Sequence, residues 1–305
     1  MLLLEDVIEE YLYHCITKGY TKKTLINKRQ EYKQLKLYLK EKRAITELES
    51  ITLHDLKAYV RGKQQSGLKP QSIESMAKMV SAFFSWCVKE EYIKENPMKK
   101  VETPKVQKLV LKGFTLDEVT AMINAFTYKN YISARNRCII AMMADCGLRA
   151  MEIRGLKITN VHETSILVNG KGNKERIVFI SPALKKILIK YARMRKDHFK
   201  NKIITDNYFL SYKGSEISHV GLYNVIKKAG KIAGIEDKRV SPHTFRHFYS
   251  VQCLIAGIDV YSLSRLLGHS EITTTERYLR SLNDEQLLDK AVSTSPLMNM
   301  VRNKL

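Results

Sequence analysis

The sequence predicts a mainly α-helical protein of two domains, with a small antiparallel β-sheet in the second. Apolar residues recur at helical spacing through most of the 305 residues. Asn96-Pro97 interrupts that pattern, and residues 98–112, which include Pro104, show no apolar periodicity. The expected organisation is an N-terminal domain at residues 1–100, a linker at residues 101–112 and a second domain at residues 113–305.

Four helices are expected in the N-terminal domain. Thr52 and Asp55 have the spacing of a capping pair at the start of the third helix, and Pro70 suits the first turn of the fourth. The apolar periodicity places these helices near residues 3–16, 21–42, 53–65 and 70–92.

The second domain begins at a capping box formed by Thr115 and Glu118. Two runs rich in β-branched residues, at 166–168 and 177–180, flank a Gly-Lys-Gly-Asn turn and predict a β-hairpin. Ser241-Pro242 is a cap followed by a first-turn proline. Further helices are expected near residues 131–146, 182–198, 219–232, 242–256, 259–267, 271–281 and, as a short amphipathic helix, 284–292.

The charge of the chain points to a polyanionic partner. The formal net charge is +21, and residues 18–43 alone carry ten basic residues against two acidic ones. Such a run is often a solvated helix face, but a second basic run at residues 185–202 gives two basic surfaces. The candidate contact residues are Lys22, Lys23, Lys28, Arg29, Lys33, Lys174 and Arg176.

Several other classes of protein are disfavoured. No apolar stretch approaches the roughly 20 residues that a membrane span needs, so no membrane association and a cytoplasmic location are expected. The five cysteines show no C-x-x-C spacing, which argues against a disulfide framework or a zinc finger. His243 and His247 are four residues apart, but no glutamate lies between them and no third ligand is evident, so neither a metal nor another cofactor is expected.

A set of residues suited to metal-free phosphoryl transfer lies in the second domain. Opening a phosphodiester needs a nucleophile, an acid for the leaving oxygen, and positive charge over the non-bridging oxygens. A tyrosine, with a pKa of about 10, needs nearby cations and an imidazole to act as the nucleophile, and arginine binds two phosphate oxygens with its planar fork. The candidates are Arg149, Lys171, His243, Arg246, His269 and Tyr278.

In these residues the chain resembles the tyrosine recombinases of the phage-integrase and Xer type. One such box alone is a weak signal, whereas four in the right order and spacing are specific. The matching boxes are Gly147-Leu148-Arg149 with Glu152 and Leu156, the Gly-Lys-Gly hairpin at residues 170–172, His243-x-x-Arg246-His247, and Leu266-Leu267-Gly268-His269 through Thr274-Thr275 to Tyr278.

The resemblance implies a nucleophile and two phosphate ligands. Tyr278 corresponds to the family's nucleophile, which forms a 3′-phosphotyrosyl bond to DNA and releases a 5′-hydroxyl. Arg149 and Arg246 correspond to the pair that clamps the scissile phosphate.

The other matched residues have supporting roles in the family. His243 corresponds to a position assigned to hydrogen bonding and base function, His269 to a second imidazole beside the phosphate, and Lys171 to the proposed general acid. Glu152 corresponds to an acidic position that supports the first arginine, and His247 is expected to be a buried hydrogen-bonding residue.

The resemblance also implies an assembly. It predicts a SAM-like helical core-binding domain and a catalytic domain with a C-terminal exchange helix, which together clamp double-stranded DNA. It further implies inverted half-sites, a homo-oligomer that is a dimer on one site and a tetramer at synapsis, and strand exchange without ATP or a metal ion.

Alternatives remain open at the level of the sequence. Arg149 could serve only as an ion-pair partner of Glu152, and Lys174 is the rival of Lys171 as general acid. The chain could be a non-catalytic DNA-binding regulator, a metal-dependent nuclease or transposase, or a topoisomerase that relaxes DNA by the same chemistry. Integration or excision of a mobile element, dimer resolution and inversion, with or without a second recombinase or accessory protein, are equally compatible with these residues.

Overall fold

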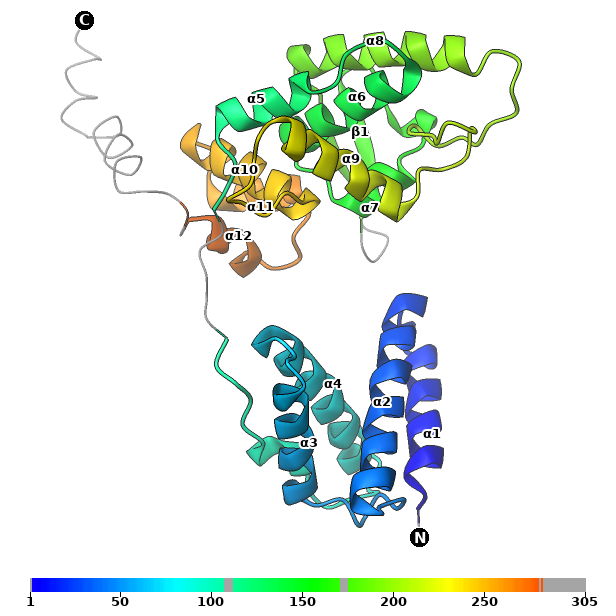
Figure 1. The fold of residues 1–305 in the computed structure, drawn as a ribbon, viewed down its shortest axis with the longest axis vertical. Coiled ribbons are helices and arrows are strands. Elements are labelled where there is room, and N and C mark those ends of the chain that lie inside the picture. Colours follow the sequence, from blue (N-terminus) through cyan, green and yellow to red (C-terminus); the bar gives the residue numbers. More distant parts are fainter. Residues whose placement is uncertain (1, 107–111, 171–174, 280, 282–305) are drawn as a thin grey trace, which may run out of the picture. The chain divides into compact units, whose positions relative to one another are not determined.

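The computed structural model describes residues 2–106, 112–170, 175–279 and 281. The chain forms two compact units, residues 1–109 and 110–305, each with its own apolar core. Both units are predominantly helical, and the described strands form one two-stranded antiparallel sheet in the second unit (Figure 1). The predicted fold class is therefore confirmed. The helix predicted near residues 284–292 lies outside the described residues.

The described residues of the first unit form four helices: α1 (Leu4–Thr17), α2 (Lys22–Arg43), α3 (Leu53–Gln65) and α4 (Pro70–Lys89). Thr52 and Asp55 form the predicted capping box, in which the Thr52 amide donates to Asp55 Oδ2 over 3.0 Å. Helix α4 ends at Lys89, earlier than residue 92, because the chain turns through Glu91 at a φ of 61°. The 3₁₀ turn η1 (Pro97–Lys100) then buries Met98 in this core.

The prediction that Lys28 belongs to a basic surface is wrong. Lys28 lies at helical spacing on the same buried face of α2 as Tyr32, Leu35 and Leu39. Only 6% of the residue is exposed. Its ammonium group donates to the hydroxyls of Tyr11 (3.0 Å) and Tyr32 (3.2 Å), and burial lowers the pKa of Lys28. The other predicted contact residues of α2 are exposed: Lys22, Lys23, Arg29 and Lys33.

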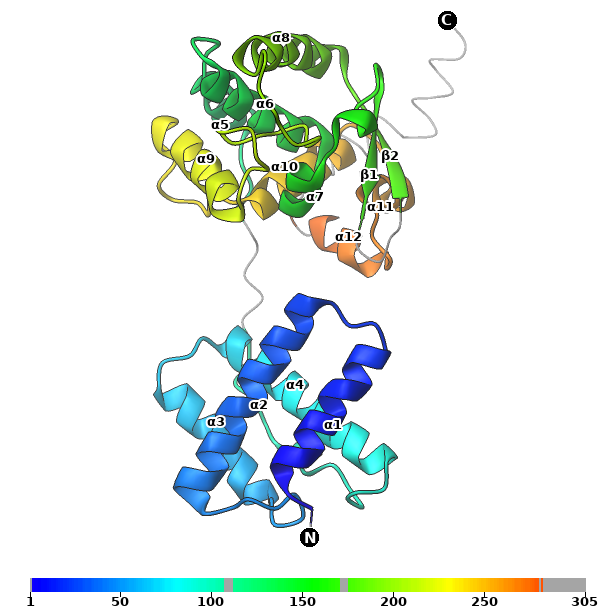
Figure 2. The ribbon, with the colours of Figure 1, turned by 90° about the vertical axis from the view of Figure 1, so that its right-hand side faces the viewer.

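The second unit is built around α6 (Tyr131–Cys146), which is buried at most of its positions. Helix α6 packs against α5 (Leu116–Asn124), α8 (Pro182–His198) and α10 (Pro242–Ile255) (Figure 2). The predicted capping box of Thr115 and Glu118 opens α5. The remaining helices are α7 (Ala150–Gly155), the 3₁₀ turn η2 (Ile158–Asn160), α9 (His219–Ile232), α11 (Val260–Leu267) and α12 (Thr273–Leu279).

The predicted hairpin consists of β1 (Ser165–Asn169) and β2 (Glu175–Phe179). The strands pair antiparallel in a register that places Leu167 opposite Ile177. Val168 and Val178 point into the core of the unit, and β2 contacts α11 (Figure 2). Strand β2 therefore links the hairpin to the end of the chain that carries His269 and Tyr278.

Candidate active site

Four separate elements bring the predicted site residues together. Arg149 immediately precedes α7, His243 and Arg246 lie on α10, His269 follows α11, and Tyr278 lies on α12. Helices α10, α11 and α12 contact one another, so residues that are distant in the sequence meet in one place. Lys171 and Lys174 lie outside the described residues.

Arg246 is held in place by two backbone carbonyls. Its Nη1 donates to Gly147 O over 2.8 Å and its Nη2 to Leu267 O over 2.6 Å, and only 3% of the residue is exposed. Burial and the nearby Arg149 charge lower the pKa of Arg246 to about 10, so the guanidinium is charged at neutral pH. Gly147 ends α6 at a φ of 59°, and a side chain there would collide with the ring of Tyr249.

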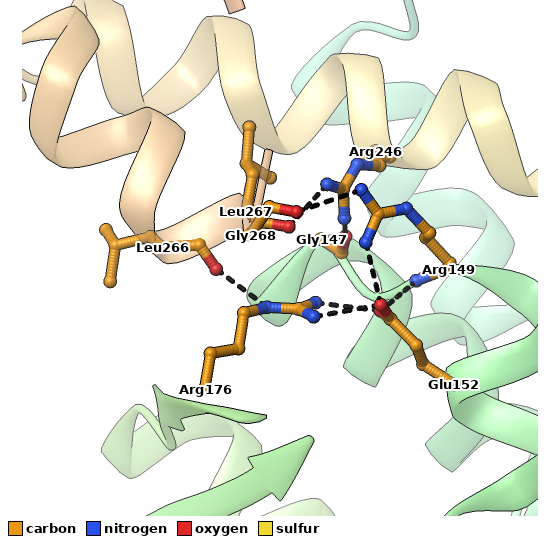
Figure 3. A network of polar contacts seen from close by, with 8 residues as sticks. All are labelled: Gly147, Arg149, Glu152, Arg176, Arg246, Leu266, Leu267 and Gly268. Carbon is orange, nitrogen blue, oxygen red and sulfur yellow. Dashed lines mark hydrogen bonds and ion pairs between the residues drawn. The ribbon is translucent and has the colours of Figure 1, made fainter. Parts of the chain in front are cut away.

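Glu152 is the shared counter-ion of two arginines (Figure 3). Arg149 donates to it from its backbone amide (2.8 Å) and from Nη1 (2.9 Å). Arg176 donates to both carboxylate oxygens, each over 2.8 Å. Burial alone would raise the pKa of Glu152, but the hydrogen bonds and charges of Arg176 and Arg149 outweigh it and hold the pKa at about 2.

Three consecutive carbonyls at the C-terminal end of α11 each accept a hydrogen bond from a different arginine (Figure 3). Leu266 O accepts from Arg176 Nε over 3.0 Å, and Leu267 O from Arg246. Gly268 O receives a longer contact of 3.4 Å from Arg149 Nη2. These carbonyls form the negative end of the helix dipole, which suits the three cations and fixes them beside His269.

His269 and His243 are imidazoles in a field of positive charge. His269 Nδ1 is hydrogen-bonded to the hydroxyl of the buried Thr275 over 2.7 Å. Burial, followed by the charges of Arg246, Arg149 and Arg176, lowers the pKa of His269 to about 4. Burial and the charges of Arg239, Arg246 and Arg149 also lower the pKa of His243. Neutral imidazoles can accept a proton, as a base for tyrosine must.

We expect His269 of the free protein to stay neutral well below pH 6.5. Its protonation can be followed in long-range ¹H–¹⁵N imidazole spectra of the full chain, with His269→Gln to assign the signal. His269 takes up a proton near pH 6.5 in the unfolded chain, but only near pH 4 in the folded chain. Neutral His269 therefore contributes stability above about pH 6.5 that is lost as the pH falls towards 4. A signal that titrates at 6.5 would contradict this description of the site.

Tyr278 lies between two histidine rings. Its ring centroid is 6.3 Å from that of His269 in a stacked arrangement, and 5.5 Å from that of His247 in an edge-on arrangement. The ring also packs against the small apolar cluster of Leu254, Leu263 and Leu267. His247 is buried, and its Nε2 is hydrogen-bonded to Ser281 Oγ over 2.9 Å.

The second wrong prediction concerns Arg176. It was expected on a DNA-contacting surface, but its side chain is only 9% exposed and each of its nitrogens binds Glu152 or Leu266 O. Arg176 is thus a structural residue of the site, and its predicted role as a DNA contact is wrong. The sequence carried no clear signal for this role, because residues 177–179 are consecutive apolar residues and do not mark which face of β2 points inward.

The described residues contain no group of three or more His, Cys, Asp or Glu side chains that could hold a metal ion. None of the helices in that same part of the chain is long and apolar enough to cross a membrane.

Arg149 and His269 line a cleft of about 1060 Å³ between the hairpin and α11. This cleft offers a bound anion guanidinium groups and the imidazole of His269.

Comparison with known proteins gives matches along both units. The profile of the phage integrase family matches residues 112–285, and that of the phage integrase SAM-like domain matches residues 3–103. Tyrosine recombinase XerD of Staphylococcus haemolyticus is 28% identical over 278 residues, which cover 90% of this chain and 94% of the relative. XerD of Listeria innocua is 25% identical over 283 residues, with the same coverage of both chains.

Solved structures share the fold. XerH recombinase in a post-cleavage complex with palindromic difH DNA superposes with a TM-score of 0.73 at 19% identity, over 94% of both chains. A lambda integrase dimer bound to a core site, residues 75–356, superposes with a TM-score of 0.71 at 19% identity, over 90% of this chain and 97% of the other.

Proposed function

The chain belongs to the phage integrase family and is a site-specific tyrosine recombinase, and we propose that Tyr278 is the nucleophile with which it cuts and rejoins duplex DNA. The observation that carries this proposal is the placement of Tyr278 beside two histidines and the buried Arg246. A phosphate bound there would meet both arginines and the tyrosine at once.

The two arginines would hold the scissile phosphate. A guanidinium has five N–H groups, and Arg246 uses two of its nitrogens for Gly147 O and Leu267 O. Arg149 uses Nη1 for Glu152 and makes the longer contact to Gly268 O, and its side chain is 32% exposed. Within the described residues, N–H groups of both side chains are left for the non-bridging oxygens, where transition-state charge develops.

In the proposed reaction, Tyr278 Oη attacks the phosphorus atom and its proton passes to an imidazole, His243 being the candidate base. The bond from phosphorus to O5′ breaks, and Lys171 is the candidate donor of the proton that makes the 5′-hydroxyl. A 5′-hydroxyl from another strand then attacks the 3′-phosphotyrosyl bond and regenerates the tyrosine. Because the covalent bond conserves the energy of the broken one, no ATP is required, and the two arginines supply the positive charge over the phosphate that a metal ion would otherwise provide.

The proposed partner is double-stranded DNA with inverted half-sites, bound by two copies of the chain and by four at synapsis. The lambda integrase structures are a dimer on a core site and a tetramer on a Holliday junction, and XerH is bound to palindromic DNA. Exposed lysines and arginines of α2 support a DNA contact by the first unit. A DNA substrate also supports a cytoplasmic location.

A nicked duplex that traps the covalent intermediate tests this function when the assay contains EDTA. A covalent adduct between the chain and DNA is expected. Its absence would favour a DNA-binding regulator or a metal-dependent nuclease. Joint products from two sites identify recombination, whereas relaxation of supercoiled DNA without joint products would identify a topoisomerase.

Lys171→Ala should cleave ordinary DNA poorly but recover on DNA with sulfur at the bridging 5′ position. A thiolate leaves without a proton, so a substrate of this kind no longer needs the general acid. The measurement is the ratio of the cleavage rates on the two substrates, with Lys174→Ala as the matched control. Rescue of the Lys174 variant instead would transfer the role to Lys174.

A further inference from the structure

All three nitrogens of Arg176 make hydrogen bonds inside the protein. Its Nη1 and Nη2 bind the two oxygens of Glu152, and its Nε binds Leu266 O. Its aliphatic stem packs on Gly268, where a Cβ atom would lie 2.9 Å from Arg176 Cδ. Gly268 also has a φ of 65°, so that position needs glycine for two reasons. Because only 9% of its side chain is exposed, Arg176 has little surface to offer a DNA phosphate.

The contacts of Arg176 determine how Glu152 holds Arg149. A carboxylate offers about four acceptor positions, and those of Glu152 are all used: two by Arg176, one by Arg149 Nη1 and one by the Arg149 amide. With Arg176 in place, the carboxylate can take only one nitrogen of the Arg149 guanidinium. Without it, Arg149 would be the remaining ion-pair partner of this buried carboxylate among the described residues, and the carboxylate would draw the guanidinium into a two-point pair.

We propose that Arg176 is a positioning residue: by saturating Glu152 and anchoring the C-terminal end of α11, it keeps the Arg149 guanidinium free for the scissile phosphate and holds His269 in place. The assignment rests on the proposed function, because it concerns the same site. Arg176 thereby connects β2 to Arg149 through Glu152, and to the end of α11 that Arg246 also binds.

Arg176→Gln should lower the single-turnover rate of adduct formation on the nicked duplex by about tenfold or more, the usual effect of losing a residue that orients another ligand. DNA affinity and its salt dependence should be unchanged, because Arg176 contacts no phosphate. Adding Glu152→Gln removes the carboxylate that captures Arg149, so the double variant should cleave faster than Arg176→Gln alone. Rescue by removal of a second charge is not expected of a residue that only stabilises the fold.

Arg154→Gln is the matched control. Arg154 pairs with Glu216 over 2.8 Å and donates to Ile217 O over 2.9 Å, so it has the same kinds of partner as Arg176 but lies outside the site. Its loss should leave the cleavage rate unchanged. Should Arg176→Gln fail to fold, Arg176→Lys keeps the charge but loses the fork, and should show an intermediate cleavage rate with normal DNA affinity.

Adduct formation by the wild-type chain distinguishes a failure of the proposed function from a failure of the positioning role. If it forms no adduct, the proposed function fails. If it forms one and Arg176→Gln cleaves normally, or the double variant is slower than the single one, the positioning role is overturned while the function stands. A loss of about one unit in the slope of log affinity against log salt for the Arg176 variants would instead make Arg176 a phosphate contact.

Discussion

A Tyr278→Phe variant is expected to bind its DNA site normally and to form no covalent adduct, with a loss of at least about 10⁴-fold in cleavage rate. Phenylalanine keeps the ring that packs against Leu254, Leu263 and Leu267, so the fold and the binding surface should survive. What disappears is the hydroxyl, the group that becomes bonded to phosphorus in the proposed reaction.

The measurement for this variant is a gel-shift titration beside a denaturing gel of the same reaction on the nicked duplex. Tyr261→Phe is a suitable control, because Tyr261 is an exposed residue on the neighbouring helix α11. It should form adduct at the wild-type rate. An adduct that persists in the Tyr278 variant would assign the nucleophile to another residue.

Arg246→Ala should lower cleavage on the order of a hundredfold or more, the loss seen when one donor is removed from an oxyanion site. It should also destabilise the chain by roughly 1–3 kcal/mol, since Gly147 O and Leu267 O lose the N–H groups that they accept from. Both effects have one origin, because the side chain that would clamp the phosphate also joins the end of α6 to the end of α11.

Arg246→Lys separates the two effects. Lysine keeps a positive charge but cannot reproduce the planar fork, so part of the cleavage loss should remain even where stability is recovered. Single-turnover cleavage and denaturant unfolding of both variants decide the matter. A variant of Arg246 that cleaves within a few-fold of wild type would remove this arginine from the transition state.

The sequence predicted those features whose causes are local. Thr52 with Asp55 and Thr115 with Glu118 mark helix starts because the capping groups lie three residues apart. The pairing of β1 with β2 was predictable from two β-branched runs on either side of the sequence Gly-Lys-Gly-Asn. The six-residue helix α7 is too short to show an apolar period, so its bounds could not be predicted.

Features that depend on tertiary contacts were missed. A basic residue in a basic segment looks exposed, but Lys28 is covered by Tyr11 of another helix, and Arg176 finds its carboxylate 24 residues earlier in the chain. The Gly147 and Leu266–Gly268 carbonyls could not be recognised as arginine acceptors either, because backbone groups carry no signal in the sequence. The depressed pKa of His269 likewise has its cause in arginines on other elements.

The most direct test of the central claim is to locate the covalent bond. The wild-type chain is incubated with the nicked duplex in EDTA, the adduct is digested with protease and nuclease, and the peptide that carries the residual nucleotide is sequenced by mass spectrometry. The structure predicts a single modified peptide with the nucleotide on Tyr278, linked through its 3′-phosphate. A nucleotide on any other residue, or a 5′-phosphate linkage to Tyr278, would contradict the assignment of this site.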